Sequence, residues 1–187
     1  MNVITASPAL IAHQRALRQC TLCPHMIRPV ITGEPVLSPI LSIGQAPGIH
    51  EAKVMRPFGW TVYMAAVCRC FPGKQPKGGD RMPSTDEVLQ CSHWLQAELQ
   101  LLQPQLIILV GKLAIAQFLN AKKLDEVVGQ CHRQLIQGRE VDLLPLPHPS
   151  GLSTWFRTEP GRTLLQDALQ TLAAHPTWLR VFSDAPT

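Results

Sequence analysis

The stretch LIILVG at residues 106–111 decides the fold class of this chain of 187 residues. A continuous apolar run that stops at a glycine is typical of a strand buried on both faces, as in a parallel sheet. Gly111 then turns the chain into an expected helix over residues 112–119. The sequence therefore predicts a strand followed by a helix at the centre of an α/β fold.

The flanking sequence repeats this pattern. Further apolar runs predict strands over residues 37–43, 62–68 and 141–146. Apolar residues at helical spacing predict three helices, over residues 9–18, from Ser84 to the residue before Pro104, and over residues 162–174. Ser84 and Glu87 have the spacing of a capping box at the start of the middle helix. The proline- and glycine-rich segment 71–83 should be a loop. We expect a single domain over residues 1–187, a three-layer α/β/α sandwich with a four-stranded parallel sheet.

The bulk composition limits the class of protein. The formal net charge of +4 permits nucleic-acid contact without demonstrating it. No apolar run reaches the roughly 18 residues that a membrane span needs, and the first 19 residues lack the pattern of a signal peptide. We therefore expect a cytoplasmic protein, in which six cysteines serve as ligands of a metal or cluster or are simply buried thiols.

Four cysteines form the strongest chemical pattern. Cys20 and Cys23 make a CxxC pair, and Cys70 and Cys91 follow far downstream. Four thiolates suit either tetrahedral zinc or a cubane iron–sulfur cluster, although a zinc ribbon usually has two CxxC pairs. The bland alternative is a set of unrelated buried thiols. The remaining Cys68 lies in a predicted strand and is expected to be a core residue.

Two loops follow predicted strands. The sequence GQAPG occupies residues 44–48, and HPSG occupies residues 148–151. Glycines let backbone amides approach a ligand closely, and the carboxyl ends of strands are where open α/β sheets bind ligands. Each motif is weak alone, because an ordinary turn or a hydrogen-bonded structural histidine would explain it as well.

The ordered set of motifs resembles the uracil-DNA glycosylase superfamily, most closely its iron–sulfur members of the family 4 type. The set comprises the CxxC pair, GQAPG at 44–48, RPF at 56–58, RCFPG at 69–73, Cys91 in the following helix, LIILVG at 106–111 and HPSGLS at 148–153. The resemblance runs from about Cys20 to Ser153. It implies that Cys20, Cys23, Cys70 and Cys91 hold a [4Fe–4S] cluster with a structural role.

The resemblance also implies the substrate site. The turn with Gly44, Gln45 and Ala46 would contact the base and the attacking water, Phe58 would stack on the flipped base, and His148 would face the uracil O2. Leu152 and Ser153 would enter the duplex. From the residues themselves, the cationic Arg69 and Lys74, with Lys77 and Arg81, could meet phosphates; the alternative is a solvated loop.

Two departures from the family pattern stand out. Family members carry an asparagine that reads the uracil edge at the position of Ala66, and an alanine side chain makes no hydrogen bond. The family also has a helix of about 20 residues after the P-F motif, whereas here Phe58 is followed almost directly by the strand that begins at Val62.

The resemblance predicts a monofunctional, monomeric glycosylase of the prokaryotic cytoplasm and nucleoid, acting on DNA that contains uracil or another deaminated base. The alternatives are a catalytically impaired iron–sulfur relative that binds nucleic acid, and a zinc-stapled binding module outside the superfamily. The sequence leaves the preferred base and the choice between single and double strands open.

Overall fold

The computed structural model describes residues 7–48, 61–76, 78–149 and 154–183. The strands are β1 Ile40–Gly44, β2 Tyr63–Ala66, β3 Leu106–Val110, β4 His132–Ile136 and β5 Arg139–Leu146. The α-helices are α1 Pro8–Arg18, α3 Thr85–Leu102, α4 Lys112–Ala116, α5 Gly161–Ala174 and α6 Pro176–Phe182. Short 3-10 helices are η2 Leu124–Glu126 and η3 Trp155–Arg157. The α/β class predicted from the sequence is confirmed.

The sheet has one strand more than the sequence predicted. Its order is β2-β1-β3-β5-β4; neighbours pair in parallel except β4, which is antiparallel to β5. The expectation of four parallel strands is therefore wrong by one antiparallel edge strand. β4 is half-exposed and carries polar residues, so it has none of the apolar continuity of β3. The turn into β5 is made by Gln137 and Gly138, both at positive φ (49° and 79°), as a two-residue hairpin turn requires.

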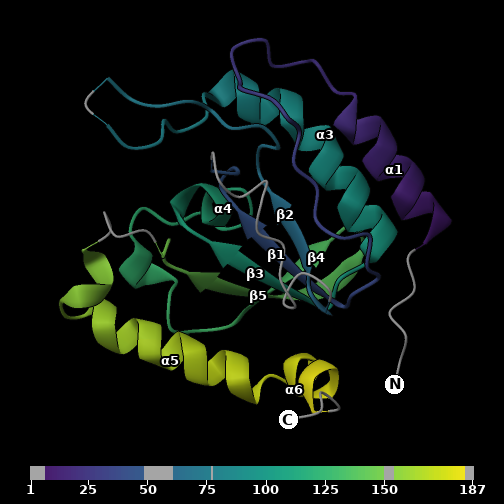
Figure 1. The fold of residues 1–187 in the computed structure, drawn as a ribbon. Coiled ribbons are helices and arrows are strands. Elements are labelled where there is room, and N and C mark those ends of the chain that lie inside the picture. Colours follow the sequence, from purple (N-terminus) through teal and green to yellow (C-terminus); the bar gives the residue numbers. More distant parts are fainter. Residues whose placement is uncertain (1–6, 49–60, 77, 150–153, 184–187) are drawn as a thin grey trace.

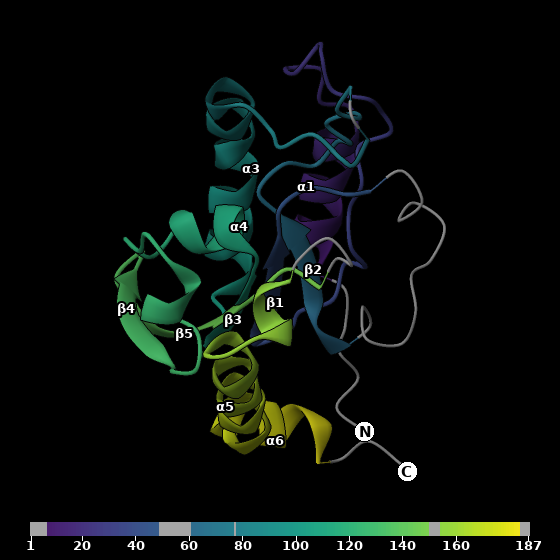
Figure 2. The same ribbon diagram turned by 90° about the vertical axis from the view of Figure 1, so that its left-hand side faces the viewer.

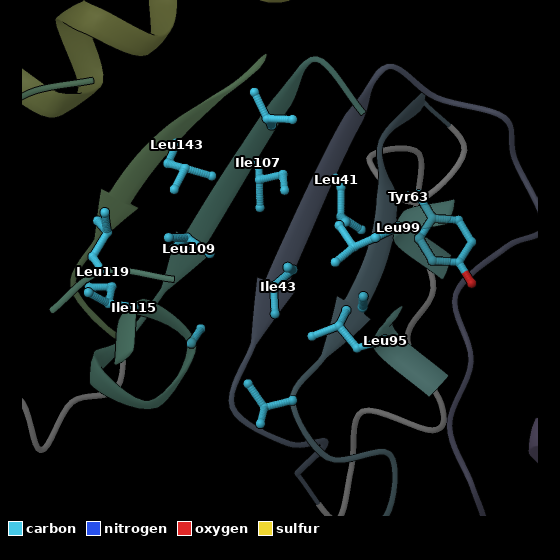
Figure 3. Packing of buried hydrophobic residues seen from close by; sticks show 14 of the residues in the cluster. Leu41, Ile43, Tyr63, Leu95, Leu99, Ile107, Leu109, Ile115, Leu119 and Leu143 are labelled. Carbon is cyan, nitrogen blue, oxygen red and sulfur yellow. The ribbon is translucent and has the colours of Figure 1, made fainter. Parts of the chain in front are cut away.

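Helices cover both faces of the sheet (Figures 1 and 2). Helices α1, α3 and α4 lie on one face, and α5 and α6 lie on the other. Successive strand residues point to opposite faces, so each strand contributes to two apolar clusters. Figure 3 shows the larger cluster, in which Leu41, Ile43, Ile107 and Leu109 meet Leu95 and Leu99 of α3 and Ile115 of α4. The smaller cluster packs Ile40, Leu106, Ile108 and Leu144 against Leu172 and α6.

Local sequence explains the longest helix. Glu87 N–H donates to the Ser84 hydroxyl at 3.2 Å, and Ser84 N–H donates to the Glu87 carboxylate at 2.7 Å, so the predicted capping box is confirmed. The helix ends at Gln103, which adopts φ 47°, immediately before Pro104. Cys91, Leu95 and Leu99 are buried on one stripe of this helix, as the spacing predicted.

Some expectations fall outside the described residues. Phe58 lies in residues 49–60, Lys77 is itself outside the described residues, and Leu152 and Ser153 lie in residues 150–153. Among the described helices, none is long and apolar enough to cross a bilayer.

Candidate functional site

The strand register places the turn after Gly44 and the residues after Leu146 at the same end of the sheet, where the parallel strands have their carboxyl ends. Gly44 pairs with Ala66, and one step earlier Ile43 pairs with Leu109. Val110 in turn pairs with Leu146, the last residue of β5. Because these strands are parallel, the turn after Gly44 and the loop after Leu146 leave the same edge, separated by β3 alone.

His148 lies against the turn that follows β3. A Cβ atom added to Gly111 would be 3.3 Å from both Cβ and Cδ2 of His148. Gly111 N–H donates to the carbonyl of Leu146 at 2.8 Å, which holds the two chain segments together. Gly111 has φ +88°, a conformation that glycine adopts without strain. The imidazole of His148 is solvent-exposed at this edge.

The turn that carries Gln45 is tied to the segment that leads to Cys70. Val67 N–H donates to the carbonyl of Gly44 at 2.9 Å, and Cys68 N–H donates to the carbonyl of Gln45 at 3.0 Å. Gln45 and Ala46 are half-buried in this turn. The strand edge and the cysteine-rich segment are therefore mechanically connected through the backbone.

The loop 71–83 lies beside the same turn. The Asp80 carboxylate comes within 3.9 Å of the position that a Cβ on Gly48 would occupy. Asp80 also accepts a charge-assisted hydrogen bond from Lys74 at 2.6 Å, and the Lys74 side chain is 57% exposed. Lys74 thus remains on the surface, while Arg81 makes two 2.8 Å hydrogen bonds to the Glu87 carboxylate.

The four sequence-predicted cysteines converge. Cys20, Cys23, Cys70 and Cys91 line one cavity of about 290 Å³. All are free thiols. Cys20 directly follows α1, Cys91 lies in α3, and Cys70 lies at the start of the 71–83 loop, so the cavity sits where three separate chain segments meet.

The thiols of this cavity influence one another's ionisation. Burial, together with the neighbouring Cys91, Cys20 and Cys70, raises the pKa of Cys23 to about 11. A hydrogen bond from Cys68 lowers the pKa of Cys91 to about 7, and that bond and burial raise the pKa of Cys68. Cys68 is buried as predicted, and it is also a fifth thiol that interacts with Cys91. A cationic centre would relieve the mutual repulsion of the thiolates.

Arg69 does not fit the expected phosphate contact. Its side chain is only 3% exposed, and it pairs with the fully buried carboxylate of Glu98. Tyr63 donates a 2.7 Å hydrogen bond to the same carboxylate. Burial opposes ionisation of Glu98, but the charge of Arg69, the nearby imidazole of His13 and the hydrogen bond from Tyr63 hold its pKa below the usual value. The Arg69 charge is thus neutralised inside the protein instead of facing a phosphate.

Comparison with known families fits this arrangement. A sequence model of the uracil DNA glycosylase superfamily matches residues 31–173. The chain belongs to this superfamily. The matched region contains the Gln45 turn, His148, Cys70 and Cys91, whereas Cys20 and Cys23 precede it, so their place beside the other two comes from the structure.

Curated members of the superfamily are similar to this chain. The type-4 uracil-DNA glycosylase of Thermotoga maritima is 28% identical over 178 residues, covering 81% of this chain and 86% of the relative. That of Pyrobaculum aerophilum is 26% identical over 162 residues, covering 73% and 80%. The type-5 uracil-DNA glycosylase of Pyrobaculum aerophilum is 27% identical over 92 residues, covering 49% and 38%. The resemblance to family 4 is confirmed.

A second cluster of possible metal ligands lies at the end of the sheet opposite His148. Cys131, Asp142 and His175 place one donor atom each within 4.8 Å of one another. Asp142 pairs with Leu106, the first residue of β3, which puts the cluster at the edge opposite His148. Sequence reasoning missed this group because its members share no spacing motif.

Hydrogen bonding already accounts for this second cluster. Thr177 N–H donates to Nδ1 of His175 at 3.2 Å, so a neutral imidazole carries its proton on Nε2, which lies 3.1 Å from the Asp142 carboxylate. A metal on Nε2 would need that position deprotonated and would disrupt the hydrogen bond to Thr177. Arg133 also bonds Asp142 at 2.8 Å and, as the largest cause, lowers its pKa. The group is a structural tie between β5 and the α5–α6 turn.

Proposed function

We propose that this member of the superfamily hydrolyses the N-glycosidic bond of uracil, or of a related deaminated base, in DNA. The observation that carries the proposal is that the Gln45 turn and the His148 segment leave the same end of the sheet, and that the turn is hydrogen-bonded to the segment leading to Cys70. The names of the type-4 relatives support uracil as the base. DNA is then the macromolecular partner, bound by a monomer.

The chemistry follows from the charges that develop in the reaction. A base within a duplex is out of reach, so the nucleotide must be extruded into the site. As the C1′–N1 bond breaks, its electron pair moves to the base and positive charge grows on the sugar. His148 donates a hydrogen bond to the uracil O2, where negative charge develops, and stabilises the transition state more than the substrate. One such donor contributes about 3–4 kcal/mol.

The remaining roles fall to the turn. The backbone amides at Gly44 and Ala46 complete the polar wall, and Gln45 orients the water that adds to C1′. That water loses a proton to solvent, and the departing base takes up a proton. A catalytic general base is needed little, because the oxocarbenium character of the sugar makes attack by water easy once the glycosidic bond is broken.

We further propose that Cys20, Cys23, Cys70 and Cys91 hold a [4Fe–4S] cluster, which when bound supplies a structural brace. The donor set fits: four thiols from three segments surround a cavity of about 290 Å³. A zinc ribbon usually has two CxxC pairs, whereas Cys70 and Cys91 lie far apart in the chain, and this spacing favours the cluster over zinc.

A second candidate is a relative that binds DNA without turnover. Ala66 favours it, because this residue pairs with Gly44 at the site edge and offers no side-chain hydrogen bond to the base. Fold and metal centre would then persist while base recognition fails.

One assay separates the two candidates. Single- and double-stranded oligonucleotides with one uracil, hypoxanthine or xanthine are incubated with excess protein and then with alkali, which cleaves abasic sites. The glycosylase proposal expects cleavage of the uracil strand, and His148→Ala should lower the single-turnover rate at least ~10-fold with little change in DNA affinity. Intact strands with every base, despite tight binding, would favour the second candidate.

A further inference from the structure

Trp94 connects two of the cysteine-bearing segments. It lies three residues after Cys91 in α3, and side chains at that spacing share a face of a helix. Its indole Nε1–H donates to Sγ of Cys20 at 3.3 Å. The same helix therefore supplies one predicted ligand, Cys91, and a hydrogen-bond donor to another, Cys20, which follows α1.

The direction of this N–H is fixed by packing. The Trp94 ring meets the edge of His13 from α1, with centroids 5.5 Å apart, and stacks at a tilt on His93 at 4.5 Å. His13 itself lies 3.5 Å from the buried Glu98 carboxylate. A half-buried indole has a donor and no acceptor, so it needs one partner, and here that partner is a thiol sulfur.

We propose that Trp94 is a positioning residue for the metal centre, and that its N–H holds Cys20 in the ligating orientation. The inference rests on the proposed metal centre but not on glycosylase activity. A hydrogen bond to a ligand thiolate orients the ligand and withdraws electron density from sulfur. It therefore slows metal loss, and it stabilises the more negative reduced form of an iron–sulfur centre, which raises its reduction potential.

The test compares Trp94→Phe with Trp178→Phe. The first variant keeps an aromatic ring but removes the N–H; the second makes the same change in α6, where Trp178 stacks on Phe182. Metal loss to a chelator is followed by absorbance near 400 nm, and the reduction potential by redox titration. Trp94→Phe should lose its cluster about 10-fold faster and have a lower potential, while Trp178→Phe behaves as wild type. Unchanged loss rate and potential in Trp94→Phe would overturn the proposal.

Other outcomes remain decisive. If the wild type holds zinc, release to a zinc dye should show the same acceleration, and equal rates would reject the role. If the wild type takes up no metal on reconstitution, both the metal centre and this inference fail. Metal retention without uracil cleavage would contradict the glycosylase proposal and leave the role of Trp94 standing. If Trp94→Phe does not fold, hydrogen exchange at the wild-type indole decides: the Trp94 N–H should exchange more slowly in metal-loaded than in apo protein, and equal rates would refute the contact.

Discussion

Gly111 leaves room for His148, although 37 positions separate them in the chain: a Cβ at Gly111 would lie 3.3 Å from the imidazole Cδ2. The absence of a side chain at Gly111 therefore helps to set where the His148 ring lies. This relationship joins the end of β3 to the end of β5 at the proposed base pocket.

Gly111→Ala should impair the proposed reaction by displacing His148. The matched control is Gly138→Ala, because Gly138 has a similar φ of +79° but has no described atom within 4 Å of its added Cβ. Both variants should lose about 1–2 kcal/mol of stability from backbone strain. Only Gly111→Ala should also lower single-turnover uracil cleavage, by about 10-fold, measured well below the melting temperature. Equal rates in the two variants would show that the position of His148 does not matter.

Removing one predicted ligand should destroy the metal centre. Cys91→Ser should lose the broad absorbance near 400 nm and bound iron, and should unfold at lower temperature because metal binding contributes to folding. Cys131→Ser is the control, since Cys131 lies close to Asp142 and His175 at the opposite end of the sheet. Cys68→Ser should keep its iron. Iron lost from Cys68→Ser and retained by Cys91→Ser would exchange the roles of these two thiols.

The buried ion pair next to the cysteine cavity should be costly to break from one side. Glu98→Gln leaves Arg69, which is 3% exposed, without its counter-charge, and should destabilise the protein by about 3–5 kcal/mol. The double variant Arg69→Met/Glu98→Leu removes both charges and should recover most of that loss. Urea unfolding of the wild type and the two variants checks this. A double variant as unstable as Glu98→Gln would mean that hydrogen bonding by Tyr63 and packing, not charge pairing, dominate.

The sequence predicted the central strands and helices because their residues are apolar on a clear period. β3 is the clearest example, since four of its five residues are buried to 3% exposure or less. β4 was missed for the opposite reason: an edge strand with polar, half-exposed residues carries little periodicity, although the Gln137-Gly138 turn was a usable signal. α6 was missed because Pro176 ended the expected helical pattern, yet proline is favoured in a first helical turn.

Features of the candidate site that follow from the order of strands and loops along the chain were predictable. Contacts between residues that are far apart in the sequence were not. Loops that follow parallel strands leave the same end of a sheet, so the placement of Gln45 and His148 at one end followed from the strand assignments. Whether Arg69 faces solvent could not be read from its neighbours, because its burial depends on Glu98, 29 residues away in another element. The Trp94–Cys20 contact, with a separation of 74 positions, is of the same kind.

Ala66 offers the most direct test of base selection. It ends β2 and pairs with Gly44, which places its side chain position at the edge where the base is proposed to lie. An asparagine there presents one acceptor and two donors, enough to bond the uracil edge, whereas alanine presents none. Ala66→Asn should therefore raise uracil cleavage about 10-fold or more relative to hypoxanthine and xanthine, since one well-placed hydrogen bond is worth about 1.5 kcal/mol. The comparison is made by single-turnover kinetics with all three substrates, and Ala65→Ser, one residue earlier and facing the core, is the control. A uracil rate that does not change would mean that this chain recognises its base through the backbone of the 44–48 turn, and that the alanine is no impairment.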